Sequence, residues 1–226
     1  MSKKVILVLA ILLGAYFLQL LPSIYISRLL TDELAKEVDY SQELAVEVNS
    51  FPSFKMLYGS VDTLNLSADK LEVDGIVLTD LKAEYAAVKF DRSNDDWLIK
   101  RSNNKELDFK LRADDLYNYL KSRSEFDIFS EFKLDFLPEQ GLFLAGEIKF
   151  LETSFFIQLL GEFEVANNKE VRFVVTELSV EDYRFATELI KPVRDRLTFR
   201  LDFSDLPIPL EIEKIEIKED YLNILG

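Results

Sequence analysis

Hydrophobic and polar residues follow two different periods along the chain. Over residues 23–38 the apolar positions recur every three or four residues, as at Ile26, Leu30 and Leu34, and charged residues occupy the opposite side. This spacing predicts an amphipathic helix. From Glu43 onward the period changes to two, which is typical of strands with one buried and one solvated face. The pattern therefore predicts a helix followed by an antiparallel sheet.

The expected strands are long and are separated by short turn sequences. Residues 59–90 predict two strands joined at Asp74-Gly75, a dipeptide that favours a tight hairpin turn. The polar stretch 91–105 is either a turn between two halves of the molecule or the tip of a hairpin. Further strands are expected over residues 106–112, 131–137, 142–150, 154–165, 171–180, 198–203, 211–217 and 221–225.

Two further helices are expected among these strands. Residues 113–121 predict a short helix that starts at Asp114-Asp115, and residues 180–197 predict a second one, which Pro192 would kink or end. The order of elements predicts an α+β fold, with a long, curved, mostly antiparallel sheet packed against two or three helices.

An uncharged apolar run precedes the amphipathic helix. It covers 17 residues, 5–21, follows two lysines, and contains Gln19 as its only strongly polar member. As a helix it covers roughly 25 Å, against a hydrocarbon thickness of about 30 Å. We therefore expect a transmembrane anchor over residues 1–22 and an extracytoplasmic domain over residues 23–226. The lysines place the N-terminus in the cytoplasm of a single-pass cell-membrane protein. A cleaved signal peptide is the alternative, although no small-x-small cleavage site follows the run.

Composition excludes several kinds of chemistry. The chain has no histidine and no cysteine, which excludes disulfides, Cys or His ligation of zinc and haem, and catalysis by thiolate or imidazole. It also has no calcium-binding loop and no glycine-rich phosphate-binding motif. Adjacent carboxylate pairs are expected by chance among 41 acidic residues, so a hydrolase without histidine is disfavoured. We expect no cofactor, no metal and no enzymatic activity.

The charge balance excludes nucleic acid as a partner. The net charge is −14, and the part after residue 22 carries 25 basic and 41 acidic residues, a net charge of −16. Binding to nucleic acid depends on basic residues that neutralise phosphates, and no long basic run occurs here. Adhesion of the whole domain to an anionic bilayer by charge is disfavoured for the same reason.

The strand expected over residues 154–165 is unusually apolar. One of its faces carries Phe155, Ile157, Leu159 and Phe163, and the whole chain contains 18 phenylalanines. These side chains either fill the core between sheet and helices or line an apolar groove that accepts acyl chains.

Two other segments are candidates for the edge of such a groove. The turn Phe51-Pro52-Ser53-Phe54 and the residues after it would place four apolar side chains at the groove mouth, unless they simply cap the sheet; these are Phe51, Phe54, Leu57 and Tyr58. Lys55 beside them is a candidate contact for a phosphate. The stiff apolar segment 206–210, with Leu206 and Ile208, is either an edge strand or a cavity lip.

Residues 48–60, followed by paired strands to Phe90, resemble the LmeA-like phospholipid-binding family. The resemblance continues through residues 113–120 and into the tail, where residues 206–210 precede a final apolar hairpin. It implies an exported, membrane-associated bacterial protein that binds phospholipid. It also implies a fold similar to tubular lipid-binding domains, in which a curved sheet wraps a long helix.

Two functions from different classes follow from these observations. The first is a membrane-anchored phospholipid-binding protein that holds or shuttles lipid in an apolar groove for envelope lipid transport or assembly. Such a task needs no acid, base or metal, because an apolar cavity replaces the bilayer as solvent for the lipid tails. The alternative is a non-catalytic scaffold that stabilises a membrane enzyme, with an envelope protein as its partner.

Overall fold

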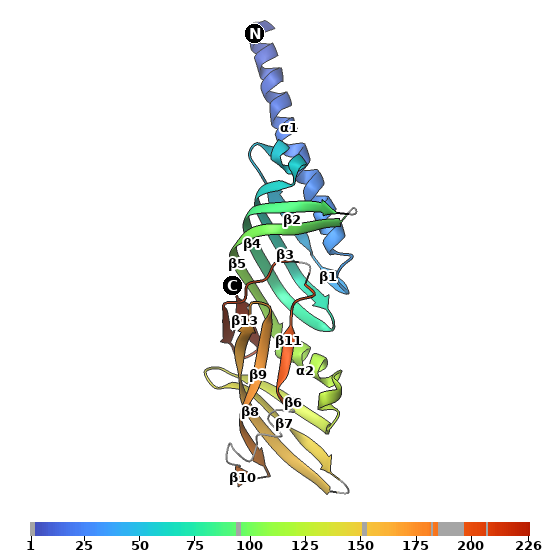
Figure 1. Cartoon of the computed structure of the whole chain (residues 1–226), viewed down its shortest axis with the longest axis vertical. Helices are drawn as coiled ribbons and strands as arrows, with labels where there is room; N and C mark the ends of the chain where they lie inside the picture. The colour runs from blue at the N-terminus through green and yellow to red at the C-terminus, as the bar shows by residue number, and fades with distance from the viewer. Residues whose placement is uncertain (1–2, 94–95, 151–152, 182, 185–196, 207) are drawn as a thin grey trace.

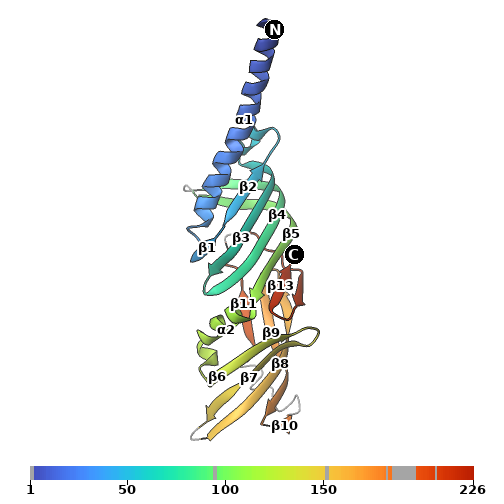
Figure 2. The same cartoon turned by 180° about the vertical axis from the view of Figure 1, so that it is seen from behind.

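Two antiparallel sheets lie one after the other along an elongated molecule (Figures 1 and 2). The computed structural model describes residues 3–93, 96–150, 153–181, 183–184, 197–206 and 208–226. In these residues every strand pairing is antiparallel, and two α-helices pack against the sheets. The expected α+β class is confirmed. The sheet, however, is divided into two.

Helix α1 (Lys3–Leu34) runs without interruption through Pro22. Its second half packs on strand β2 (Ala45–Asn49), with Ile26 and Leu30 buried, so the amphipathic helix docks on the domain as expected. The expected transmembrane helix is not supported. Across the described part of the chain, no helix combines the length and the apolar character that are needed to cross a membrane.

Polar side chains of α1 also cover the open edge of β2. The amide of Val46 donates to Thr31 Oγ1 over 3.1 Å, and the amide of Val48 donates to Ser27 Oγ over 3.0 Å. An edge strand otherwise leaves such amides free to pair with another chain. The helix therefore closes this edge of the sheet.

The first sheet has seven strands and contains both ends of the domain. The strand order in this sheet is β1-β3-β4-β5-β13-β12, and β2 also pairs with β3, beside β1. Its other strands are β1 (Tyr40–Gln42), β3 (Ser60–Val73), β4 (Ile76–Ser93), β5 (Asp96–Arg112), β12 (Lys214–Ile217) and β13 (Tyr221–Leu225). Because β13 pairs with β5, the end of the chain returns to the first sheet.

Hairpin turns and bulges shape this sheet. Asp74 and Gly75, with φ of 51° and 75°, form the expected two-residue turn between β3 and β4. The polar stretch 91–105 belongs to the β4–β5 hairpin, so the hairpin-tip alternative is the correct one. Asp80 and Ala87 lie at register shifts between β4 and β5 and have positive φ. Bulges of this kind bend a strand and increase its twist, which curves the sheet.

The second sheet has six strands, with the path β10-β9-β8-β7-β6 and β11 paired to β9. Helix α2 (Ala113–Lys121) precedes it and buries Leu116 and Leu120 completely. The remaining elements are the short 3-10 helix η2 (Ser124–Phe126) and the strands β6 (Phe129–Leu137), β7 (Gly141–Phe150), β8 (Thr153–Asn167), β9 (Glu170–Val180), β10 (Tyr183–Arg184) and β11 (Phe199–Asp202).

The helix expected over residues 180–197 is wrong at its start, where Val180 ends strand β9. Residues 183–184 form strand β10, which pairs with β9 through Val180 and Ser179. Residues 185–196, with Pro192, lie outside the described residues, and Leu197 at the end of the expected helix is helical and buried.

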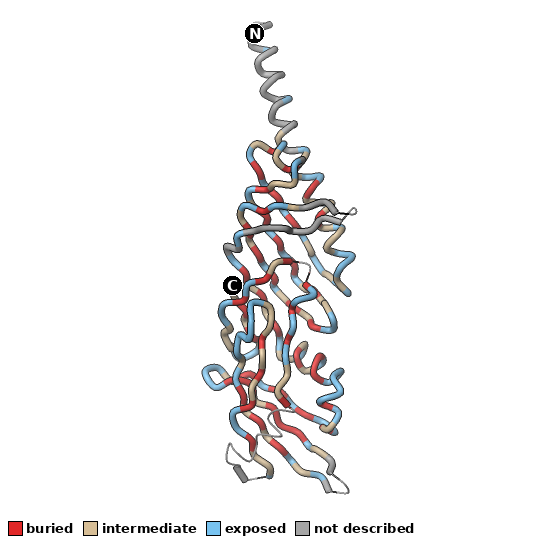
Figure 3. Tube along the Cα trace, in the orientation of Figure 1, coloured by how far each residue is buried: buried red, intermediate tan, exposed pale blue. Residues whose placement is uncertain are grey.

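The apolar segment after β11 packs into the core of the molecule. Leu206, Ile208 and Leu210 are buried, and the Tyr85 hydroxyl donates a hydrogen bond of 2.7 Å to the carbonyl of Pro209. Burial raises the pKa of Tyr85. Figure 3 shows buried and exposed residues alternating along the strands, as expected for sheets with one covered face.

Candidate lipid-binding site

The candidate residues on β8 lie in the core rather than around an open groove. Ile157 and Leu159 are buried, while Phe155 and Phe163 are half-buried. Leu206 and Ile208 are also buried, and the gap between them and the end of α1 holds only about 10 Å³. That volume has room for about one water molecule, so an acyl chain does not fit there. A lipid-binding role for these six residues stays a prediction.

The turn before β3 is different, because its apolar side chains face solvent. Phe51 is 77% exposed, Phe54 is 58% exposed and Tyr58 is 83% exposed. The last two belong to the 3-10 helix η1 (Ser53–Tyr58), which Gly59 ends with φ of 69°. The Leu57 side chain lies outside the described part of the structure.

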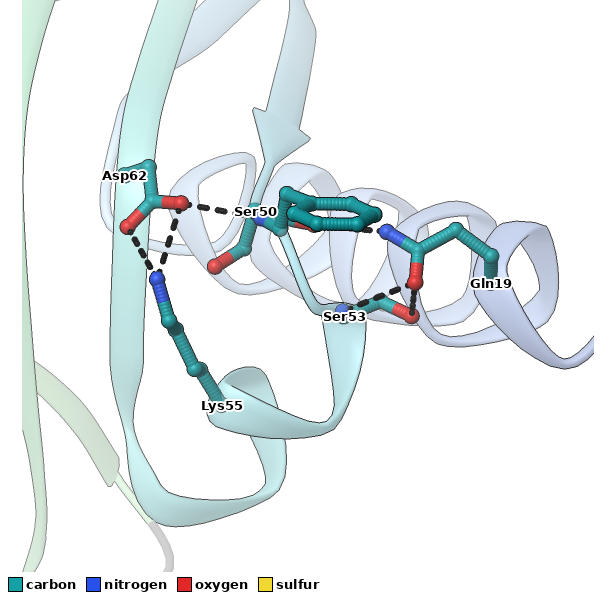
Figure 4. A network of polar contacts seen from close by, with 6 residues as sticks. Gln19, Ser50, Ser53, Lys55 and Asp62 are labelled. Carbon is teal, nitrogen blue, oxygen red and sulfur yellow. Dashed lines mark hydrogen bonds and ion pairs between the residues drawn. The ribbon is translucent and has the colours of Figure 1, made fainter.

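Gln19 holds this turn against α1 (Figure 4). Its side-chain amide donates to the carbonyl of Ser50 over 2.9 Å. Its carbonyl oxygen accepts from both the amide and the hydroxyl of Ser53, each over 3.1 Å. Ser23, one helical turn later, contacts Met56 with its hydroxyl 3.9 Å from the sulfur. The only strongly polar residue of the apolar run therefore fixes the turn to the helix.

Asp62 secures the other side of the turn (Figure 4). Its carboxylate accepts a hydrogen bond of 2.8 Å from the Phe51 amide, and Lys55 Nζ lies 3.2 Å from both carboxylate oxygens. The amide and the lysine both lower the pKa of Asp62. Lys55, the sequence candidate for a phosphate contact, is therefore already paired with a carboxylate.

A much larger cavity than the gap beside α1 lies where α2 and η2 meet strands β6, β7 and β8. It is an open cleft of about 1000 Å³. Strands β6 and β7 lie toward the end of the long axis that is opposite the N-terminus (Figures 1 and 2). Sites for small molecules have volumes of about 300–1000 Å³, so this cleft is large enough for a substantial part of a lipid.

Aromatic residues lie along one wall of the cleft, where Phe126, Phe129 and Phe132 are largely buried and expose only a small part of each side chain. The ring centroids of Tyr117 and Phe132 are 4.8 Å apart, and Phe126 and Phe129 pack beside them. The aromatic packing continues behind the cleft, where the ring of Phe126 packs against that of Phe199. The ring centroid of Phe199 lies 6.3 Å from that of Phe163, a predicted site residue. Phe163 thus supports the cleft from the core without lining it.

Gly146 forms part of the same surface. A Cβ atom at this position would lie 2.5 Å from the carbonyl oxygen of Glu131 and less than 3 Å from side-chain atoms of Phe129 and Phe132. The glycine therefore allows the two phenylalanines to pack close to β7.

Charged side chains of both signs occupy the exposed rim of the cleft. Lys121 and Lys133 supply two cations. Glu131 and Glu147 lie directly opposite each other on β6 and β7, and neither has an ion-pair partner among the described residues. Like charges in directly opposed positions destabilise a sheet, and a bound cation relieves that repulsion. The rim thus offers cations for a phosphate and carboxylates for an amine.

Sequence reasoning missed this cleft because its residues come from five separate elements. One signal was present: Phe126, Phe129 and Phe132 recur every three residues, a spacing that breaks the strand period. The neighbouring small residues Ala145 and Gly146 inside an apolar strand were a second signal.

Comparison with known proteins identifies the family of the chain. A family model described as LmeA-like phospholipid-binding matches residues 22–226. No curated protein and no solved structure matches the chain. The family match covers nearly the whole sequence, including the turn, both sheets and the cleft. The chain therefore belongs to the LmeA-like phospholipid-binding family.

Proposed function

We propose that this protein holds a phospholipid in the cleft between α2 and strands β6 and β7. The observation that carries the proposal is a cleft of about 1000 Å³ with an aromatic wall, in a chain whose family binds phospholipid. Each acyl methylene that leaves water for this wall contributes about 0.8 kcal/mol. The cleft surface therefore supplies a solvent for part of the acyl chains.

The rim supports a zwitterionic headgroup. The phosphate would lie near Lys121 and Lys133, and an amine near Glu131 and Glu147. Both pairs are exposed, so water competes for each contact, and their contribution is to selectivity more than to total affinity.

The role that we propose is to hold or shuttle lipid for envelope lipid transport or assembly, without catalysis. We further propose that the N-terminal helix keeps the protein at the membrane and that the domain lies outside the cytoplasm. Support for this arrangement comes from the sequence, in which two lysines precede an uncharged run of 17 residues.

Native mass spectrometry of the full chain purified from cells tests the proposal. The expected result is co-purified phospholipid that is lost in the variant Ala145→Trp, because the indole fills the cleft. The matched control is Val165→Trp, at a position 37% exposed on β8 and outside the cleft. A lipid-free wild-type chain, or equal lipid in the two variants, contradicts the proposal.

A separate variant tests headgroup recognition without altering the packing of the aromatic wall of the cleft. Glu131→Gln combined with Glu147→Gln removes the paired carboxylates from the exposed rim. We expect the bound fraction to shift from amine-containing lipids toward lipids without an amine. An unchanged lipid profile contradicts the headgroup assignment but leaves the acyl-chain site intact.

A further inference from the structure

A second exposed apolar surface lies far from the cleft. The described part of the chain exposes ten large hydrophobic side chains, and six of them belong to two short segments. We call these six the collar: Leu21, Ile24 and Tyr25 on α1, with Phe51, Phe54 and Tyr58 on the turn. We propose that the collar inserts into the interfacial region of a phospholipid bilayer. This inference rests on the proposed function, because it supplies the surface through which a lipid carrier meets its membrane.

Hydrogen bonds hold the two halves of the collar at one level. Gln19 bonds to Ser50 and Ser53 of the turn, and Ser23 contacts Met56 of η1. The inward side of α1 at this level is thus defined by these contacts and, one turn later, by buried Ile26. At 100° per residue, positions 21, 24 and 25 point to the opposite side of the helix. Figure 1 shows α1 leaving the domain at the level of this turn. The exposed apolar side chains therefore flank that point.

The composition of the collar favours a bilayer over a protein partner. Aromatic residues, and tyrosine in particular, concentrate at membrane interfaces, where an apolar ring and a polar tip are both satisfied. The only charged residue of the turn, Lys55, is neutralised by Asp62. No unpaired charge of the turn therefore has to enter the interface.

The sequence of α1 on both sides of the collar also supports insertion into a bilayer. Toward the N-terminus α1 carries the uncharged run 5–21. In the other direction the next outward residue is Arg28, which is exposed and has no ion-pair partner in the described part of the molecule. A long cationic side chain beside an apolar surface suits a lipid phosphate. The order apolar run, aromatic collar, arginine matches the order from bilayer interior to headgroups.

Site-specific fluorescence on the full chain tests the inference directly. The chain has no cysteine, so Tyr58→Cys or Tyr25→Cys gives a single attachment point for an environment-sensitive fluorophore. The matched control is Val165→Cys, another exposed apolar position, located on β8. Vesicles contain equal amounts of phosphatidylcholine and phosphatidylglycerol, with a nitroxide-labelled lipid as quencher, and only the protein that floats with vesicles is measured.

We expect labels at positions 58 and 25 to shift to the blue and to be quenched several-fold more strongly than the label at position 165. Equal quenching at the three positions, or no flotation of the chain, overturns the inference. Blue-shifted emission at position 58 that appears without vesicles and grows with protein concentration also overturns it, since a second copy of the chain then covers the collar.

Two variants separate this inference from the proposed function. Ala145→Trp should remove lipid from the cleft and leave quenching at position 58 unchanged. Combined Phe51→Ser and Phe54→Ser should reduce quenching at position 58 several-fold and leave co-purified lipid unchanged, since both side chains are exposed and their loss leaves no cavity. If the cleft binds no lipid but the collar is quenched, only the proposed function fails. If the label at position 58 is quenched equally with and without the two phenylalanine substitutions, only the inference about the collar is overturned.

Discussion

Individual polar residues explain how a strongly apolar turn stays ordered while it faces solvent. Phe51 exposes 77% of its surface, so its position does not come from burial. Its backbone is fixed instead by the carboxylate of Asp62, which also holds Lys55. The sequence identified the apolar residues of the turn, but it did not identify Asp62, because that side chain comes from the strand that follows and meets the turn only in the fold.

The Asp62 contact predicts a defined pH dependence. Its folded-state pKa lies below the ordinary value of 3.8, so the contact stabilises the turn fully above that value and is lost as the pH falls through the lower folded pKa. We expect the Phe51 amide proton to shift in NMR spectra with a midpoint below 3.8. In Asp62→Asn this titration should disappear.

Lys55→Met separates the two causes of the lowered pKa. The hydrogen bond from the Phe51 amide is the larger cause and remains in this variant, so the midpoint should rise but stay below 3.8. A midpoint that is unchanged in Lys55→Met, or a titration that survives in Asp62→Asn, contradicts this account.

At the scale of elements, periodicity and turn residues predicted the strands well. The β3–β4 hairpin follows from Asp74-Gly75, and β6 to β9 follow from alternation. The division into two sheets was not predictable in this way, because alternation gives the face of each residue but not the partner of each strand. The bulges at Asp80 and Ala87 were also missed, since neither residue is of a type that favours positive φ as strongly as glycine.

The hydrogen bonds of Gln19 join α1 to the turn that contains η1, and they can be removed selectively. Gln19→Leu removes three hydrogen bonds at a partly buried site, a change that costs about 1–3 kcal/mol of local stability. We expect amide exchange in residues 50–58 to accelerate about 5- to 150-fold, while exchange in β8 stays unchanged. Hydrogen-exchange mass spectrometry measures both segments in one experiment.

Ser53→Ala is the matched control for the Gln19 variant. It removes the hydroxyl bond to Gln19 and keeps the bonds of the Ser53 amide and the Ser50 carbonyl. Its effect on exchange should therefore lie between the wild-type chain and Gln19→Leu. Equal exchange in wild type and Gln19→Leu means that apolar packing alone holds the turn on the helix.

At the scale of the whole molecule, the sequence predicted a lipid-binding protein but located only one of the two surfaces that we propose to face lipid. The turn was visible because its aromatic residues fall within one short segment, residues 51–58. The cleft was not, because Tyr117, Phe126, Lys133 and Gly146 come together only when β6 and β7 pair beside α2. The buried candidates on β8 illustrate the reverse case, since an apolar strand has the same pattern whether it lines a core or a groove.

The elongated shape places these two surfaces toward opposite ends of the long axis (Figures 1 and 2). If the collar rests in a bilayer, the cleft is held away from that bilayer and opens to water. We therefore expect a fluorophore at Lys133→Cys, on the rim, to be quenched by iodide in solution and not by nitroxide lipid in the vesicle to which the chain is bound. The label at position 58 should show the reverse pattern.

This geometry has a consequence for how lipid reaches the cleft. We expect a cleft distant from the docked membrane to receive its lipid from another carrier or from a second bilayer, so loading should depend on the concentration of donor vesicles added to bound protein. Strong nitroxide quenching at position 133 contradicts this arrangement. It means that the cleft end contacts the same membrane as the collar, and that the chain lies along the bilayer instead of standing on it.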